Sequence, residues 1–537
     1  MSKRKGQVRM SEIEFDDDSS HEESSQIILI PDPNYSGDND SGSDDENYND
    51  FPCTSYKKVY QDYSANLTKL EAEHEYNWVD GEKNCKDQIE NETLLSDSQK
   101  KMIVQSTPVQ LFESFFSDEI KNYISTATKE NNFELSRSDL DIFIGILIFS
   151  CFNKRKSQLD YWSTDPFLSA NVVSSVMSRN RFESIKAHIK YSKASDNNPN
   201  DKGWRVRSLI NLFQKNILQF GYFQTAMSID EMMIKSYAKT SLKQFIRGKP
   251  IRFGLKLWGL CTSNGYLLGW DLYCGKNQIE TNVLMKCALG SRVVMNLLKD
   301  FLHNTTPRKI NLYHVYFDNY FTCFDLILHL RNIGLRATGT IRNDRVKIKN
   351  EICKKAERGT FAVKNDKNSQ INYITVMDSK PVSIASTAAG VNPILPIKRY
   401  SSKEHEKKEI QFPHAFHIYN KYMGGVDTHD AHCNNLLPSI RSKKWTWVVF
   451  TRLIQASITN SVVIYNTAST GNKKSTKEFA LDIAKHYLAN REKEITQTNV
   501  SKRVEKQSKC SSCPIKTYKF CKGCNAYVCK TCFPNKH

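Results

Sequence analysis

Two carboxylates stand three residues apart in the stretch IYNKYMGGVDTHD, residues 418–430, where Asp427 and Asp430 follow a Gly-Gly pair. If this stretch is helical, the two side chains share one face with Cβ atoms roughly 5–6 Å apart, so their like charges repel. A solvated helix turn tolerates such a pair, whereas a divalent cation between the carboxylates would turn repulsion into attraction. The pair is therefore a candidate half of a metal site.

Two further carboxylates lie upstream in strand-like sequence. In MSIDEMMI, Asp230 would share a strand face with Ser228 and Met232, and a charge among apolar neighbours is costly unless it is paired or metal-bound. Asp318 ends the apolar run VYF, the end of a strand at which α/β sheets carry functional groups. Oxygen ligands from two strands and a helix suit Mg²⁺, and two such ions about 3.5–4 Å apart support phosphoryl transfer. Taken singly, each Asp is more often a cap, a surface charge or a salt-bridge partner.

The last 28 residues contain six of the 15 cysteines, in the pattern C-x2-C-x7-C-x2-C-x4-C-x2-C-x4-H. So short a segment cannot bury a core unaided, and paired cysteines at this spacing indicate zinc ligation in a reducing compartment rather than disulfides. With seven ligands, two cross-braced sites would lack one ligand, and a single zinc with spare ligands is the alternative. The cross-braced sets would be Cys510, Cys513, Cys529 and Cys532 in one site, and Cys521, Cys524 and His537 in the other.

The formal net charge of +18 hides a strong asymmetry along the 537 residues. Residues 10–56 contain fourteen acidic residues and no Lys or Arg, so the rest of the chain carries about +32. A basic body of this size favours a polyanionic partner, with nucleic acid ahead of a membrane surface. The acidic segment is either a solubilising tail or an arm that competes with DNA for the basic face. The N-terminus shows no secretory signal, and the apolar run at 139–151 is too short to span a bilayer.

The periodicity of apolar residues changes along the chain. Three- and four-residue spacing predicts helices over most of 105–225, two-residue alternation predicts strands from 226, and helices return after 412. We therefore expect a multidomain α/β protein with a mixed-sheet core. The expected segments are 1–104 (disordered, acidic), 105–225 (helical), 226–345 (sheet core), 346–412 (insertion), 413–436 (last core helix), 437–495 (helical), 496–509 (basic linker) and 510–537 (zinc-binding).

Five motifs occur in an order that resembles piggyBac-type DNA transposases: SIDE, GKPIRFGLKLWGL, YFDNYFT, GTIRNDR and YNKYMGGVDTHD. DYWSTDPFLS and MSRNRF resemble the helical region of that family, and the resemblance covers roughly 105–537. It implies an RNase H-like core with an insertion, a flanking helical dimerisation and DNA-binding domain, and a zinc domain that recognises element-end DNA. One departure is FPHAFHI before the last motif, where the family usually has a Lys-Pro start.

The resemblance further implies cut-and-paste transposition of DNA in the nucleus by a homodimer. The enzyme would bind terminal inverted repeats, excise the element through hairpin intermediates without a footprint, and integrate it at TTAA. Asp230, Asp318 and Asp427 would hold two Mg²⁺ or Mn²⁺ ions, and Asp430 would be a fourth required acidic residue, either a ligand or a group that orients one. Two zinc ions would occupy the C-terminal domain.

Basic residues near the carboxylates are candidate DNA contacts. Asn319, Arg342 and Arg345 match family positions that contact DNA. Phosphate contacts are expected from Lys249, Arg252 and Lys256, for which a solvated strand edge is the alternative. Two other functions remain open: a domesticated, catalytically silent DNA-binding protein, and a RING-like ubiquitin ligase or chromatin adaptor suggested by the zinc tail alone. Aspartate at all four acidic positions favours an active enzyme.

Overall fold

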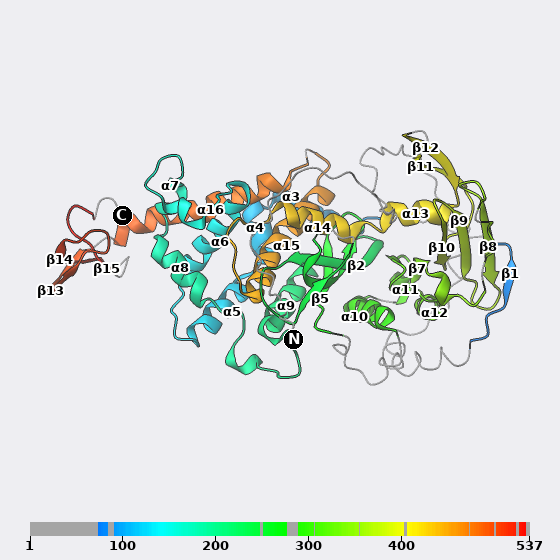
Figure 1. Ribbon diagram of the computed structural model, residues 1–537, viewed down its shortest axis with the longest axis horizontal. Helices are drawn as coiled ribbons and strands as arrows, with labels where there is room; N and C mark the ends of the chain where they lie inside the picture. The colour runs from blue at the N-terminus through cyan, green and yellow to red at the C-terminus, as the bar shows by residue number, and fades with distance from the viewer. Residues whose placement is uncertain are drawn as a thin grey trace, which may run out of the picture.

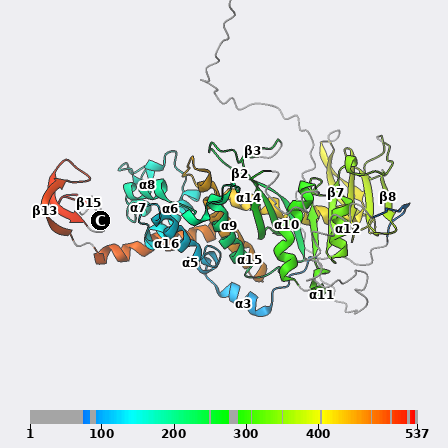
Figure 2. The same cartoon turned by 90° about the horizontal axis from the view of Figure 1, so that it is seen from below.

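The computed structural model describes residues 74–532 apart from 84–90, 248–250, 276–287, 306, 349, 354, 402–404, 472, 499–500 and 522–525. The described chain is elongated, and the small C-terminal sheet, the helical part and the sheet-containing part follow one another in this order along its length (Figure 1). Turned by 90°, the C-terminal sheet again stands at one end (Figure 2).

The helical part consists of segments that precede the sheet-containing part in the sequence and segments that follow it. Its helices pack closely, since a Cβ on Gly145 in α6 would lie 2.8 Å from Cβ of Tyr487 in α16. The helix α15 is long and apolar enough to cross a membrane, but its most apolar window is wholly buried, and it serves here as a core helix. The bounds are α3 (Asp97–Gln105), α4 (Pro108–Phe115), α5 (Asp118–Lys129), α6 (Arg137–Phe152), α7 (Asn171–Ser174), α8 (Arg179–His188), α9 (Trp204–Ile217), α15 (Trp445–Ala468) and α16 (Thr476–Thr498).

A ten-stranded mixed sheet forms the core of the other part, in the order β1-β8-β9-β10-β7-β6-β2-β4-β3, with β5 also pairing β4. Within it, β2 lies antiparallel to β4 and parallel to β6, and β6 lies parallel to β7. The strands are β1 (Trp78–Asp80), β2 (Ala226–Lys235), β3 (Lys243–Phe245), β4 (Phe253–Thr262), β5 (Leu267–Leu272), β6 (His314–Phe317), β7 (Arg336–Ile341), β8 (Phe361–Asp366), β9 (Asn372–Met377) and β10 (Pro381–Ser386).

Helices cover both faces of this sheet. Two-residue alternation along β6 sends Tyr316 into the cluster with α13 and sends Val315 and Phe317 into the cluster with α10 and α12. The helices are α10 (Leu289–Asn304), α11 (Pro307–Ile310), α12 (Phe324–Asn332), α13 (His414–Tyr422) and α14 (Gly425–Asn435). Outside the sheet lie the hairpin β11 (Leu395–Ser401) and β12 (Glu406–Phe412) and the C-terminal sheet β13 (Ser501–Lys509), β14 (Lys516–Cys521) and β15 (Ala526–Tyr527).

The structure confirms the mixed α/β fold and corrects two expectations. Of the segment 1–104, expected to be disordered, residues 1–73 and 84–90 lie outside the described residues, but Trp78 in β1 packs 4.8 Å from Phe324, ring centroid to ring centroid, and α3 has a capping box at Ser96. The basic linker 496–509 is instead the end of α16 followed by β13, which pairs with β14. The segment 346–412, expected as an insertion, contains β8, β9 and β10, and β10 extends the central sheet by pairing with β7.

Candidate active site

The parallel pairing of β2 with β6 brings two of the predicted carboxylates together. Ile229 lies opposite Phe317 in the register, so the next residues, Asp230 in β2 and Asp318 after β6, also lie side by side. Side chains two residues apart in a strand point to the same face. Ser228 and Tyr316 contact α14 and α13, so Asp230 and Asp318 lie on the sheet face that these helices cover. Asp318 thus directly follows β6, as predicted, and Asp230 lies inside β2 beside it.

The helix α14 brings the other two carboxylates to the same sheet face. A Cβ on Gly425, the first residue of α14, would lie 2.2 Å from the carbonyl oxygen of Thr262 and 2.7 Å from Oγ of Ser228. The start of α14 therefore rests directly on β2 and β4. Asp427 follows two residues later and is exposed, and Asp430 lies one turn further on.

A buried tyrosine lies on the same side of the sheet. Tyr419 in α13 is buried, and its hydroxyl lies 3.4 Å from Oγ1 of Thr340. Burial raises the pKa of this hydroxyl, and the negative charges of Asp318, Asp230 and Asp427 raise it further. This direction agrees with carboxylates from β2, from the end of β6 and from α14 that face α13.

The carboxylates near β2 and β6 are oriented by their own backbone. The amide of Tyr320 donates to Oδ1 of Asp318 at 2.8 Å, and the amide of Glu231 donates to Oδ1 of Asp230 at 2.7 Å. Among the described residues, only the cysteine cluster brings three or more candidate donor atoms within 4.8 Å of one another. The oxygens of Asp230, Asp318 and Asp427 do not meet this distance criterion. The all-oxygen donor set fits Mg²⁺.

Asp430 differs from its neighbours because it has a buried cationic partner. Its Oδ1 lies 3.0 Å from Nη2 of Arg452, a side chain that is 1% exposed, and its Oδ2 accepts from Nδ2 of Asn434 at 3.2 Å. The adjacent carboxylate raises the pKa of the guanidinium even though burial alone would lower it. This geometry favours Asp430 as a group that anchors α14 to α15 over a direct metal ligand.

The basic residues predicted to contact DNA fall into different environments. Nε of Arg342 donates to Oδ1 of Asn319 at 2.8 Å, and both side chains stay near the surface beside Asp318. Nη1 of Arg345 donates to the carbonyl oxygens of Tyr320 and Thr322 at 2.9 and 2.8 Å, so it braces the loop after Asp318. Arg252 is exposed, and Lys249 lies outside the described residues.

Lys256 is held inside the fold instead of at a strand edge. Its Nζ lies 3.1 Å from Oε2 of Glu231 and 3.9 Å from the ring centroid of Trp258. The rings of Tyr320 and Tyr273 complete a cage at 5.2 and 5.9 Å. This arrangement does not favour the predicted phosphate contact of Lys256, because its ammonium group already has an anionic and an aromatic partner.

The C-terminal cysteines assemble as the spacing predicts for the first zinc site. The sulfur atoms of Cys510, Cys513, Cys529 and Cys532 all lie within 4.8 Å of one another, which fits a tetrahedral Cys₄ zinc site. Burial alone would raise the pKa of Cys510, but backbone N–H groups, first that of Cys529 at 3.3 Å, lower it to about 6. Cys521 is buried beside this cluster, and Cys524 and His537 lie outside the described residues.

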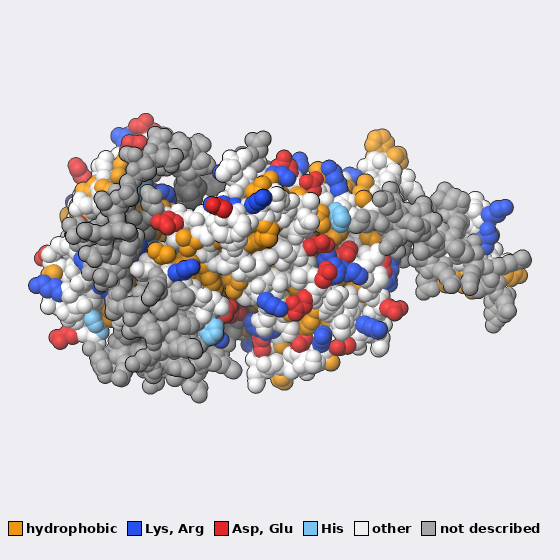
Figure 3. All heavy atoms as spheres, turned by 180° about the vertical axis from the view of Figure 1, so that it is seen from behind, with side chains coloured by type: hydrophobic (Ala, Val, Ile, Leu, Met, Phe, Trp, Pro, Cys, Tyr) orange, Lys and Arg blue, Asp and Glu red, His pale blue; other side chains and the backbone are white. Residues whose placement is uncertain are grey.

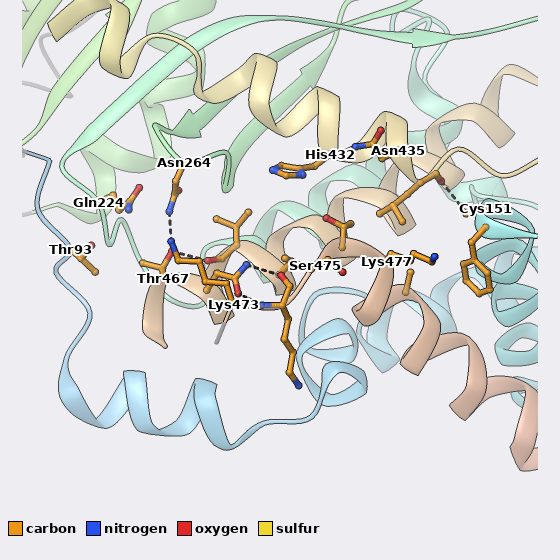
Figure 4. A pocket seen from close by; sticks show the side chains of 18 residues that line it. Thr93, Cys151, Gln224, Asn264, His432, Asn435, Thr467, Lys473, Ser475 and Lys477 are labelled. Carbon is orange, nitrogen blue, oxygen red and sulfur yellow. Dashed lines mark hydrogen bonds between the residues drawn. The ribbon is translucent and has the colours of Figure 1, made fainter. Parts of the chain in front are cut away.

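A separate cavity of about 820 Å³ lies on the helical side of the molecule (Figure 4). His432 from α14, Asn264, Thr467 from α15 and Lys473 before α16 line part of its wall, and Nδ2 of Asn264 donates to Oγ1 of Thr467 at 2.9 Å. The four Asp residues of the candidate site are not part of its lining. On the face drawn in Figure 3, the described acidic and basic side chains are interspersed and form no continuous basic stripe.

Two residues next to the candidate site, Tyr419 and Arg452, were not predicted from the sequence. Tyr419 carries no special signal in YNKYMGG, because an aromatic residue at helical spacing usually indicates core packing. Arg452 did offer a signal, a single charge in the apolar run WVVFTRLIQ, and a buried charge requires a partner. What the sequence does not reveal is that this partner is Asp430.

Comparisons with known proteins agree with the geometry. Residues 107–462 match the family model described as Transposase IS4. Over 352 residues the chain is 33% identical to PiggyBac transposable element-derived protein 3 of Homo sapiens, covering 64% of this chain and 58% of that protein. Over 413 residues it is 28% identical to PiggyBac transposable element-derived protein 2 of Homo sapiens, covering 75% and 69%. The matched region is therefore less than two thirds of the first relative's length.

One solved structure is similar in fold. It is a cryo-EM structure of the piggyBac transposase synaptic complex with hairpin DNA, with a TM-score of 0.60 and 22% identity. The likeness covers 80% of this chain and 97% of that chain, so the mixed sheet and the helical part belong to one shared architecture.

Proposed function

Because this chain belongs to the piggyBac transposable element-derived family of DDE transposases, we propose that it is a metal-dependent DNA transposase. The observation that carries the proposal is that Asp230 in β2 and Asp318 after β6 lie on the sheet face against which α14, the helix of Asp427, is packed. These carboxylates come from three separate elements and leave a site that is partly open to solvent. The basic body of the chain favours a polyanionic substrate.

The strand order supports an RNase H-like catalytic core. Three antiparallel strands, β5, β4 and β2, are followed in the sheet by the parallel strands β6 and β7, with Asp230 in the middle of β2 and Asp318 directly after β6. In this proposal Asp230, Asp318 and Asp427 hold two Mg²⁺ or Mn²⁺ ions. When bound, such ions activate an attacking oxygen and stabilise a leaving oxygen in phosphodiester chemistry.

The remaining residues of the site position these ligands. Backbone amides orient Asp230 and Asp318, and Arg345 braces the loop that follows Asp318. The ion pair between Asp430 and Arg452 fixes α14 relative to α15 and so fixes the place of Asp427. Asn319 and Arg342, joined at the surface beside Asp318, are proposed to contact the DNA backbone.

The proposal extends to the steps of transposition. The enzyme would bind terminal inverted repeats as a homodimer, excise the element through hairpin intermediates and integrate it at TTAA in nuclear DNA. The Cys₄ cluster, with bound zinc, would hold the C-terminal sheet in a form that recognises element-end DNA. A second zinc would involve Cys521, Cys524 and His537.

A second function is favoured by the names of the human relatives, which are called transposable element-derived proteins. The chain would then bind DNA without cutting it. A ubiquitin ligase or chromatin adaptor is not favoured, because the family match at 107–462 lies outside the zinc tail.

An excision assay separates the two functions. A reporter flanked by the element's own terminal repeats is exposed to the wild type or to Asp318→Asn in the presence of Mg²⁺. We expect excision by the wild type, none by the variant, and equal DNA binding by both. Equal excision by both proteins would refute the catalytic assignment. DNA binding without excision by the wild type would establish the silent DNA-binding function.

A further inference from the structure

Two exposed aromatic rings stand at the edge of the central sheet. Phe245 in β3 lies directly opposite Phe253 at the start of β4, and their ring centroids are 4.7 Å apart with planes inclined by 39°. The two residues are 56% and 57% exposed. Single exposed apolar side chains are common on protein surfaces, but a packed pair of open aromatic faces marks a place where a partner can gain contact area.

Basic side chains surround these rings. Nζ of Lys243 lies 5.8 Å from the ring centroid of Phe253, and Arg247 and Arg252 are exposed at the next positions of the two strands. The amide of Ile246 donates to the carbonyl oxygen of Arg252 at 2.9 Å, so the strands stay paired beyond the rings. Aromatic faces flanked by Lys and Arg are the combination with which proteins bind unpaired nucleic acid.

The register of β4 places the rings on the same sheet face as the candidate active site. Gly259 lies opposite Asp230, and a Cβ on Gly259 would be 3.4 Å from Cγ1 of Val426 in α14. Phe253 precedes Gly259 by six residues, an even number, so both point to this face. Along the strand the separation is about 20 Å. Figure 2 shows β3 at the border of the molecule, with β2 and α14 on its inner side.

We propose that Phe245 and Phe253 form a stacking platform for an unpaired nucleobase of the DNA whose backbone is held at the Asp site. Lys243, Arg247 and Arg252 neutralise the phosphates on either side of that base. A fully paired duplex offers its base faces only at its ends, so the platform selects DNA with unpaired nucleotides. Every base has a π-face, and the preference is therefore for structure and not for sequence. The inference rests on the proposed function for the presence of DNA.

The test uses the purified full-length protein with bound zinc and two short DNAs that differ only in a single-stranded gap. The gap carries 2-aminopurine, whose fluorescence falls when the base stacks on an aromatic ring. We expect the wild type to quench this fluorescence and to bind the gapped DNA more tightly than the paired DNA. The double variant Phe245→Ala/Phe253→Ala should lose the quenching and weaken gapped binding by about tenfold, with paired binding unchanged.

Two control variants test whether the effect depends on the aromatic rings at these two positions. Phe245→Tyr/Phe253→Tyr keeps the ring faces and should retain both the quenching and the preference. Phe361→Ala removes a ring that is 36% exposed on β8, at the other end of the sheet order, and should change neither. Equal thermal unfolding of all variants shows that the Ala substitutions have not disturbed the fold.

The outcomes separate this inference from the proposed function. Quenching that survives in the double Ala variant, or equal binding of gapped and paired DNA by the wild type, would overturn the platform. A wild type that binds and quenches but does not excise would refute the transposase activity and leave the platform standing. A wild type that binds neither DNA would overturn both. Self-association lost in the double Ala variant, without any effect on DNA, would assign the rings to a contact between copies and overturn the platform.

Discussion

Replacing Asp430 with Asn should destabilise the protein even when no metal is present. The substitution leaves the guanidinium of Arg452, which is 1% exposed, without the carboxylate that lies 3.0 Å away. Removing one partner of a fully buried ion pair costs about 3–5 kcal/mol, and the carboxylate here is 21% exposed, so we expect a loss of about 2–4 kcal/mol. For a cooperative unit of about 150–250 residues this corresponds to a fall in Tm of roughly 4–16 °C.

Two variants separate this structural role from metal binding. Asp427→Asn changes an exposed carboxylate one turn away on α14 and should leave the metal-free Tm close to that of the wild type. Asp430→Asn combined with Arg452→Met removes both charges, so most of the lost stability should return, since the buried cation is gone. The recovery measures the coupling between the two side chains.

The assay is thermal unfolding in metal-free buffer, repeated with increasing Mg²⁺. We expect Mg²⁺ to raise the Tm of the wild type and of Asp430→Asn, and to have less effect on Asp427→Asn, because Asp427 is a proposed ligand and Asp430 is not. If Asp430→Asn melts like the wild type without metal and loses the stabilisation by Mg²⁺, Asp430 binds metal directly and the ion-pair argument is wrong.

Acid, chelation and loss of the caged lysine should each affect a different part of the molecule. Burial lowers the pKa of His429 to about 4 from its ordinary 6.5. The unfolded chain therefore binds the proton more tightly than the folded protein. The free energy of unfolding should be highest above pH 6.5 and should fall by about 3 kcal/mol toward pH 4. His429→Gln should flatten that part of the unfolding profile, and an unchanged profile would contradict the assignment. Chelation or Cys532→Ser should remove zinc, measured by mass spectrometry, and unfold the C-terminal sheet; loss of the main melting transition would contradict this separation. Lys256→Met leaves Glu231 without its cation and should lower the Tm. Weaker DNA binding with an unchanged Tm would instead support the predicted phosphate contact of Lys256.

Several strands of the sheet were predictable because they carry their own alternation of apolar residues. The alternation that begins at 226 corresponds to β2, β4 and β5. The helix α10 carries a helical pattern too, with Val294, Leu298 and Phe301 buried, but it was not predicted. The strand β1 has no such local signal, because it exists only through pairing with β8, almost three hundred residues away.

The candidate site was predictable to the extent that its ligands lie in short motifs. The motif order and the residue types predicted Asp230, Asp318 and Asp427 as ligands, and the register explains why the first two lie side by side. The environment of each side chain was not predictable, since it depends on elements distant in sequence. Lys256 was predicted to contact phosphate, but Glu231 on the paired strand and the rings of Trp258 and Tyr320 enclose its ammonium group.

The Gly-Gly pair before Asp427 shows that a motif can encode a packing distance as well as a ligand. Gly424 is the N-cap of α14, and Gly425 is the residue whose missing Cβ lets the helix lie against the carbonyl oxygen of Thr262. A glycine at this position weakens a helix by roughly 0.5–1 kcal/mol relative to alanine. Any larger side chain would push the start of α14 off β2 and β4, and Asp427 would move away from Asp230 with it. The helix therefore gives up intrinsic stability for the short distance to the sheet on which the carboxylate site depends.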